Sequence, residues 1–271
     1  MKMRLIAAAV GVPLLLIVLL ALPQVFTAIL VGAMCALAAY ELLWGTNLVK
    51  EYRLVVYTAA MSFLVSMWSC FGMDYPSALL GVLGFASLLF MESLISHGKL
   101  EFQKIAVCLA GGLLIPFLLS ALVRIRVTNY GPFHILIPFI LAFTSDAGAY
   151  FAGRFLGKHK LAPVISPNKT VEGVVGGVAA AILSMLLYGL IMDLAFGFDV
   201  RYLNAVAYGI VGALAGVFGD LAFSAIKRQT GIKDYGNLIP GHGGVLDRFD
   251  SMTIVAPLTE AFIILIPVVV R

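Results

Sequence analysis

Long apolar runs, separated by short polar segments, dominate the sequence from end to end. A membrane-spanning helix needs about 20 apolar residues, because the hydrocarbon core is about 30 Å thick and an α-helix rises about 1.5 Å per residue. The pattern therefore predicts an all-α, polytopic integral membrane protein with about nine transmembrane helices. The nine runs are Leu5–Leu22, Val25–Trp44, Leu54–Phe71, Ser77–Ile95, Ile105–Val123, Phe133–Phe151, Gly173–Leu194, Leu203–Ile226 and Met252–Val270.

Lysine and arginine are distributed unevenly between these runs, and this bias predicts the orientation of the chain. With a cytoplasmic N-terminus, the inner side holds fourteen of them: Lys2, Arg4, Lys50, Arg53, Lys99, Lys104, Arg154, Lys158, Lys160, Lys169, Lys227, Arg228, Lys233 and Arg248. The outer side holds four: Arg124, Arg126, Arg201 and Arg271. We therefore expect a multi-pass protein of the cell (inner) membrane with a cytoplasmic N-terminus and an uncleaved first span. The two long polar loops, Arg154–Glu172 and Lys227–Asp250, then face the cytoplasm.

The amino-acid composition also indicates an integral membrane protein. The chain is 62% hydrophobic and 12% charged, whereas globular domains are nearer half apolar and a quarter charged. In this setting the net charge of +4 fits loops that face anionic lipid, and we expect no nucleic-acid partner. The three cysteines lie within apolar runs, which favours buried unpaired thiols over disulfides. We divide the chain into residues 1–130, with spans one to five, and residues 131–271, a catalytic region with spans six to nine and both loops.

Ionisable residues inside the predicted spans require an explanation, because each is costly in hydrocarbon. Glu41 and Glu92 lie near predicted cytoplasmic helix ends, where snorkelling or local pairing suffices. Asp146 and Asp220 lie at inner-leaflet depth, close to the polar loops. Asp220, Ser224 and Lys227 are spaced i, i+4, i+7 and share one helical face. On this span alone, a charged stripe that pairs with another helix and a functional site are equally good interpretations.

The two loops add groups suited to phosphate and metal. In the first, Lys169 and Thr170 offer donors just ahead of a helix N-terminus, where phosphate is favoured. In the second, glycines such as Gly243 and Gly244 let backbone N–H groups approach a ligand closely. Asp247 and Asp250 are spaced i, i+3, which with Asp220 supplies the hard oxygen ligands that suit Mg²⁺ beside substrate phosphates. Neither a GxxxxGK[ST] motif nor a strand-associated GxGxxG motif is present, which excludes a P-loop or Rossmann nucleotide site.

At these residues the sequence closely resembles the phosphatidate cytidylyltransferase (CDP-diacylglycerol synthase) family. The resemblance rests on Ser224-Ala225-Ile226-Lys227-Arg228, then Lys233-Asp234, then Pro240-Gly241-His242-Gly243-Gly244-Val245-Leu246-Asp247-Arg248-Phe249-Asp250. The Ser166–Gly173 stretch and Asp146–Tyr150 with Gly153-Arg154 are also similar to the family. Before about residue 140 only the hydropathy agrees.

The resemblance implies the reaction CTP + phosphatidic acid → CDP-diacylglycerol + pyrophosphate, dependent on Mg²⁺ (with Mn²⁺ as a substitute), in a homodimer within membrane lipid. It also implies that Asp220 and Asp247 bind the metal, with Asp250 close to the same centre, and the number of carboxylates leaves room for a second cation. The predicted catalytic residues are Asp220, Lys227, Asp247, Arg248 and Asp250. The predicted substrate-binding residues are Asp146, Lys169, Thr170, Glu172, Ser224, Arg228, Lys233, Gly243 and Gly244.

Two other functions use similar features. A CTP-dependent lipid kinase of the polyprenol or phytol type would use the same metal chemistry on an alcohol and release CDP. An ion-coupled transporter would use Asp146, Asp220 and Glu260 as a relay, but it predicts inverted repeats, which we do not find, and gives no role to the Lys227–Asp250 loop. A CDP-alcohol phosphotransferase is disfavoured because the D-G-x-x-A-R spacing is absent.

Overall fold

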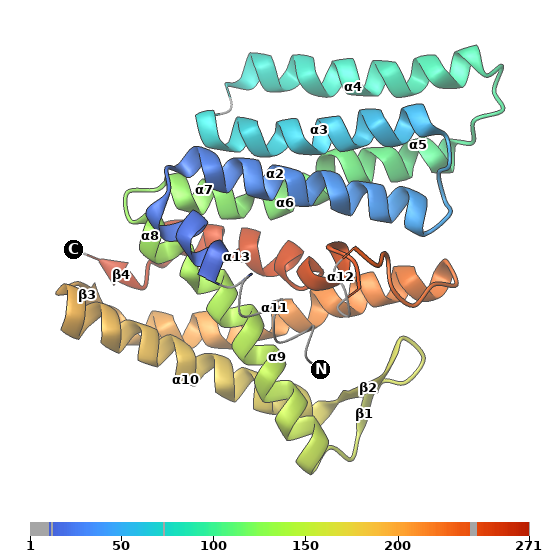
Figure 1. The fold of residues 1–271 in the computed structure, drawn as a ribbon. Helices are drawn as coiled ribbons and strands as arrows, with labels where there is room; N and C mark the ends of the chain where they lie inside the picture. The colour runs from blue at the N-terminus through green and yellow to red at the C-terminus, as the bar shows by residue number, and fades with distance from the viewer. Residues whose placement is uncertain (1–10, 12, 73, 239–242, 271) are drawn as a thin grey trace. The chain divides into compact units, whose positions relative to one another are not determined.

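The computed structural model of the protein describes residues 11, 13–72, 74–238 and 243–270. The chain forms two compact units (Figure 1). Unit 1 comprises Met1–Gly131 and Lys227–Phe249, and unit 2 comprises Pro132–Ile226 and Asp250–Arg271. The second long loop of the sequence therefore belongs to the N-terminal unit.

In its described part, the regular elements of unit 1 are all helices (Figure 1). Helix α2 continues into the π-helix η2, and α3 packs along α2. The elements are η1 (Ile17–Ala21), α2 (Gln24–Tyr40), η2 (Glu41–Gly45), α3 (Tyr52–Phe71), α4 (Tyr75–Ile95), α5 (Phe102–Leu109), η3 (Ala110–Leu114), α6 (Ile115–Leu119), α7 (Ala121–Val127) and α12 (Leu246–Phe249), with α8 (Gly131–His134) at the boundary. Helix α4 buries only Phe85 and Leu89, so most of its apolar surface is left for lipid or another protein.

Unit 2 is a helical unit with two small antiparallel strand pairs, β1 with β2 and β3 with β4. Its elements are α9 (Leu136–Leu156), β1 (Lys160–Ala162), β2 (Ser166–Thr170), α10 (Val171–Phe196), β3 (Asp199–Val200), α11 (Tyr202–Gln229) up to Ile226, α13 (Met252–Leu265) and β4 (Val269–Val270). Its core gathers around Ile137, Met185, Tyr208 and Val255.

Small residues bring α9 and α10 into close contact. A Cβ added at Gly148 would lie 2.7 Å from the Gly176 carbonyl oxygen, and one at Gly177 would lie 2.8 Å from that of Ser145. Such contacts between backbones are typical of membrane helices, where small residues allow close packing. Helix α10 begins at its N-cap Thr170, whose hydroxyl accepts from Gly173 N, and ends at Gly197 with φ +68°. The α9–α10 pair thereby fixes the β1–β2 hairpin that carries Lys169.

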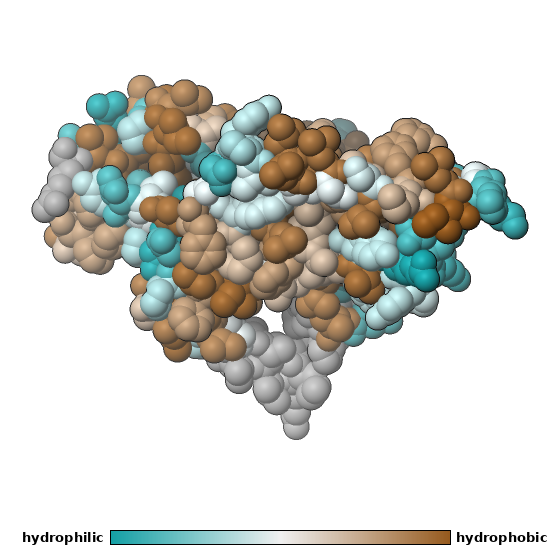
Figure 2. All heavy atoms as spheres, turned by 90° about the horizontal axis from the view of Figure 1, so that it is seen from above, coloured by the Kyte–Doolittle hydropathy of each residue, from teal (hydrophilic) through white to brown (hydrophobic). Residues whose placement is uncertain are grey.

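The apolar runs largely become helices. Seven helices in the described part of the chain are long and apolar enough to cross a membrane, and they match predicted spans two to eight. The chain is thus an all-α multi-pass membrane protein, and Figure 2 shows apolar side chains spread over the visible face with hydrophilic residues gathered near its edges. The count of nine is not reproduced: residues 5–10 and 12 of the first predicted span lie outside the described residues, and the ninth span corresponds to the 14-residue helix α13.

Candidate functional site

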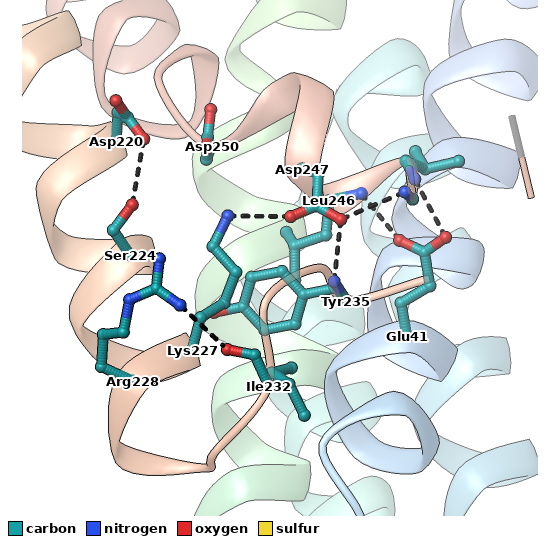
Figure 3. Close-up of polar contacts among 12 residues, drawn as sticks. Glu41, Asp220, Ser224, Lys227, Arg228, Ile232, Tyr235, Leu246, Asp247 and Asp250 are labelled. Atoms are coloured by element: carbon teal, nitrogen blue, oxygen red, sulfur yellow. Dashed lines mark hydrogen bonds and ion pairs between the residues drawn. The ribbon is translucent and has the colours of Figure 1, made fainter. Parts of the chain in front are cut away.

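A buried ion pair organises the polar loop of unit 1. Lys227 Nζ donates to Asp247 Oδ1 at 2.8 Å, and the two side chains are 9% and 3% exposed. The second carboxylate oxygen, Oδ2, accepts from Tyr235 N at 2.8 Å and from Gly244 N at 3.1 Å. The ammonium also lies 5.4 Å from the centre of the Tyr235 ring. Asp247 is therefore the point at which the helix end, the loop and the glycine turn meet (Figure 3).

The glycine turn has a backbone that requires glycine. Gly243 adopts φ +87°, and a Cβ there would lie 3.3 Å from Asp247 Oδ2. A side chain at this position would therefore be strained and would crowd the carboxylate. The N–H group of Gly244 points at that carboxylate, so the turn binds an anion of the protein itself. Pro240, Gly241 and His242 lie outside the described residues.

In unit 2 the predicted carboxylate Asp220 pairs with a lysine from the first loop. Lys169 Nζ lies 2.5 Å from Asp220 Oδ2, with side-chain exposures of 23% and 29%. Ser224, one helical turn along α11, donates to Asp220 Oδ1 at 3.2 Å. The predicted sharing of a helical face by Asp220 and Ser224 is therefore observed, and Lys169 is brought to the same carboxylate from β2.

Asp250 lies beside this cluster. A Cβ added at Gly219, the residue before Asp220, would lie 2.8 Å from the Asp250 carbonyl oxygen. This glycine lets α11 contact the chain just ahead of α13, so Asp220 and Asp250 occupy adjacent segments (Figure 3). Asp250 Oδ1 accepts from Ser251 N at 2.7 Å.

Glu172 serves the first loop directly. Its carboxylate lies 2.6 Å from His159 Nδ1 and accepts from the backbone N–H groups of Lys158 and His159 at 3.1 and 3.2 Å. These contacts hold the start of the β1–β2 hairpin against the start of α10. In this structure Glu172 therefore shapes the loop that presents Lys169.

The remaining predicted cations are accessible. Arg228, Lys233 and Arg248 are exposed, and Arg228 Nη1 donates to the Ile232 carbonyl oxygen at 3.4 Å. Asp146 is exposed on α9. Guanidinium and ammonium groups that are exposed to solvent are the side chains that recognise phosphate.

The carboxylates do not form a ready cage for a metal ion. Within the described ranges, no group of three or more His, Cys, Asp and Glu side chains is placed to hold one. Asp220 and Asp247 each carry a lysine ammonium at hydrogen-bond distance. The donor set nevertheless fits Mg²⁺, a hard cation that takes one or two carboxylates together with waters and substrate phosphates.

Two residues of the site went unrecognised in the sequence. Tyr235 supplies a backbone donor to Asp247, and nothing in its local pattern marks it. Glu41 is 4% exposed and accepts from Val245 N and Leu246 N, so it neither snorkels nor pairs locally. Its signal was available, since it is a carboxylate inside an apolar run. Glu92, interpreted in the same way, pairs with a basic residue of helix α3: its Oε1 lies 3.5 Å from Arg53 Nη1.

Known proteins resemble this chain over almost its whole length. The family model described as "Cytidylyltransferase family" matches residues 2–266. A phosphatidate cytidylyltransferase of Staphylococcus epidermidis is 32% identical over 266 residues, covering 97% of this chain and 99% of that protein. One from Bacillus subtilis is 32% identical, covering 95% of each chain. One from Staphylococcus aureus is 33% identical, covering 84% of this chain and 86% of its own.

Proposed function

We propose the activity of this chain from its family, because the chain belongs to the cytidylyltransferase family and its relatives are named phosphatidate cytidylyltransferase. The reaction is CTP + phosphatidic acid → CDP-diacylglycerol + pyrophosphate, a nucleotidyl transfer in phospholipid biosynthesis. The observation that carries this proposal is the match of 97% of the chain to 99% of a relative with that name.

The chemistry of the site supports a direct attack of the lipid phosphate on the α-phosphorus of CTP. A phosphate monoester has a second pKa of about 6, so it is largely dianionic near neutral pH and already nucleophilic. The new P–O bond forms as the bond to pyrophosphate breaks, and no proton needs to be removed. The main obstacle is repulsion between two polyanions. Lys169, Lys227, Arg228, Lys233 and Arg248 reduce it, because they supply positive charge where phosphates would bind.

We propose Mg²⁺ as the cofactor, with Mn²⁺ as a substitute, on Asp220 and Asp247 with Asp250 close by. The support is chemical: these are hard oxygen ligands, and Mg²⁺ needs only one or two of them when phosphates complete its coordination. When bound, the ion would neutralise charge on the phosphates and the departing pyrophosphate. A second cation is part of this proposal, since Asp146 and Asp250 are further carboxylates in unit 2.

Product analysis tests the activity. Purified protein given CTP, phosphatidic acid and Mg²⁺ is expected to release pyrophosphate and CDP-lipid in equal amounts, and chelation of the metal should stop both. With lipid omitted, labelled pyrophosphate should not exchange into CTP, because direct attack forms no cytidylyl-enzyme. Zn²⁺ alone should not restore a chelated sample, because the proposed ligands are oxygens.

The same assay separates the alternatives. Release of CDP with a phosphorylated polyprenol or phytol would identify a lipid kinase. Exchange of pyrophosphate without lipid would indicate a covalent route. Ion flux in vesicles without any nucleotide product would favour the transporter.

We also propose that both long loops and the active site face the cytoplasm. The support is the excess of Lys and Arg in those loops. Cysteines introduced at the exposed positions Lys160 and Lys233 should resist a membrane-impermeant maleimide in sealed cells and react after permeabilisation. A cysteine at the exposed Arg201 is the matched control and should react from outside, while native Cys35, Cys70 and Cys108 are buried. Labelling at position 160 or 233 in sealed cells would reverse the orientation.

We propose a homodimer as well, on the family resemblance. The exposed apolar side chains of α4, among them Leu80 and Leu94 at 70% and 78% exposure, offer surface for a second copy or for lipid. Light scattering of the detergent-solubilised protein, corrected for bound detergent, gives the protein mass, which distinguishes a dimer from a monomer.

A further inference from the structure

Glu41 places a carboxylate deep in unit 1, at the junction where α2 becomes the π-helix η2. Its Oε1 accepts from Val245 N at 2.9 Å and its Oε2 from Leu246 N at 2.8 Å, contacts that span 204 and 205 residues of sequence (Figure 3). A buried carboxylate is costly unless hydrogen bonds compensate for its lost hydration. Each oxygen of this carboxylate accepts from one backbone N–H group, that of Val245 just ahead of α12 and that of Leu246, the first residue of α12.

The loop is shaped to admit this carboxylate. A Cβ added at Gly236 would lie 2.6 Å from Glu41 Oε1, and one added at Gly244 would lie 2.5 Å from Oε2. One turn of helix further along η2, a Cβ at Gly45 would lie 2.1 Å from the Tyr235 carbonyl oxygen. Three glycines thus allow the loop and the end of η2 to close around the side chain of Glu41.

The contact leads directly to Asp247. The N–H group of Gly244 donates to Asp247 Oδ2, and those of Val245 and Leu246 donate to Glu41. Two carboxylates therefore share three successive N–H groups of one turn. Asp247 follows Leu246 in the chain, so a displacement of this turn would move Asp247 relative to Lys227 and Tyr235.

We propose that Glu41 is a positioning residue of the active site, which fixes the Gly244–Leu246 turn so that Asp247 and Lys227 keep their places. This inference rests on the proposed function, which makes Asp247 and Lys227 residues of the active site. The part of the chain before about residue 140, which carries no recognisable motif, thereby contributes a polar group that the site requires.

A direct role for Glu41 is the competing explanation. The residue also lines a pocket of about 350 Å³ together with Tyr40, Trp44 and Asp234, where a ligand could reach it. Both of its oxygens already accept from the backbone, which favours the positioning role. The two roles differ in what a substitution does to the loop itself.

Glu41→Gln in the full-length protein tests the proposal with two readouts. The amide keeps one acceptor oxygen and turns a donor toward the other N–H group, so only one of the two bonds survives. Hydrogen exchange of the 243–249 segment, measured without substrate, should accelerate. The kcat for CDP-lipid formation should fall roughly 10- to 100-fold, since small misplacements of catalytic groups have effects of this size. The pH profile of kcat should keep its shape, because Glu41 transfers no proton.

Matched variants complete the design. Gly244→Ala adds a methyl group that would lie 2.5 Å from Glu41 Oε2, so it should also accelerate hydrogen exchange and lower kcat. It replaces Glu41→Gln if that variant does not fold. Glu92→Gln removes another intramembrane carboxylate of unit 1, and Gly84→Ala adds a methyl group where nothing lies within 4 Å. Both controls should leave kcat within about twofold of wild type, because Glu92 contacts Arg53 and Tyr57 rather than the Gly244–Leu246 turn, and a methyl group at Gly84 has no neighbour to displace.

The outcomes are distinct. Faster exchange with reduced kcat supports positioning. Unchanged exchange overturns it, whether kcat falls, as for direct catalysis, or stays the same. Faster exchange with unchanged kcat also overturns it, because the turn would then not matter for turnover. A wild-type protein without cytidylyltransferase activity refutes the proposed function instead. The exchange measurement would still show whether Glu41 fixes the Gly244–Leu246 turn.

Discussion

Asp247→Asn is expected to abolish turnover and to lower the unfolding temperature together. Asn keeps the shape but removes the charge that balances the buried ammonium of Lys227. Leaving one partner of a buried ion pair uncompensated costs about 3–5 kcal/mol. For a chain of this size such a loss corresponds to roughly 10 °C in the unfolding temperature. Turnover should fall at least about 100-fold, because the variant loses both a proposed Mg²⁺ ligand and the carboxylate that holds the Lys227 ammonium in place.

A double variant separates these two effects. Combining Lys227→Met with Asp247→Asn removes both charges, and replacement of a whole buried pair is often neutral for stability. The double variant should therefore regain most of the lost unfolding temperature and none of the activity. If the single variant unfolds like the wild type, the pair is not the stabilising contact that its burial indicates. If the double variant regains turnover, neither charge is part of the catalytic site.

The fold was predictable where a single local property determines it. Seven apolar runs became helices of membrane-spanning length because hydrocarbon requires every backbone group to be paired within its own segment. The last run departs from the pattern for a local reason. Hydropathy continues to Val270, but Pro267 disfavours helix at Ile266, so α13 ends at Leu265 and the chain proceeds to strand β4.

The site was predictable within a helix and unpredictable across the fold. The Asp220–Ser224 contact follows from i, i+4 geometry. The partner of Lys227 did not follow, because the charged stripe on its helix left a helix pairing and a functional site equally acceptable. In the structure Lys227 pairs with Asp247 and Asp220 pairs with Lys169.

Glu41 shows the limit most clearly. Its partners Val245 and Leu246 offer backbone N–H groups, which every residue except proline possesses. The residue types in the loop therefore do not predict the contact, and no sequence periodicity connects positions more than 200 residues apart. What a sequence can supply is the anomaly of a carboxylate in an apolar run. The role of Gly236 and Gly244, which leave space for the Glu41 carboxylate, can be recognised only when the structure places the loop against η2.

Asp220→Asn is expected to remove activity while leaving stability almost unchanged, in contrast to Asp247→Asn. The Asp220–Lys169 pair is partly exposed, with side-chain exposures of 29% and 23%, so its contribution is about 1 kcal/mol or less. Asn also keeps an oxygen that can accept from Ser224. The unfolding temperature should therefore stay within roughly 3 °C of wild type, while turnover falls at least about 100-fold.

A magnesium titration of the same variant tests why activity is lost. If Asp220 is a metal ligand, loss of its charge weakens the binding of Mg²⁺. Any residual turnover should then require several-fold more Mg²⁺ for half-maximal rate than the wild type. Asp193→Asn is the matched control, because Asp193 also lies in unit 2 but accepts from Tyr202 Oη near the predicted outer end of α10. It should leave both the rate and the Mg²⁺ requirement unchanged. Near-wild-type turnover in Asp220→Asn would remove Asp220 from the site. A large rate loss with an unchanged Mg²⁺ requirement would instead make Asp220 the partner that orients Lys169 toward phosphate, and the metal would have to be assigned to the remaining carboxylates.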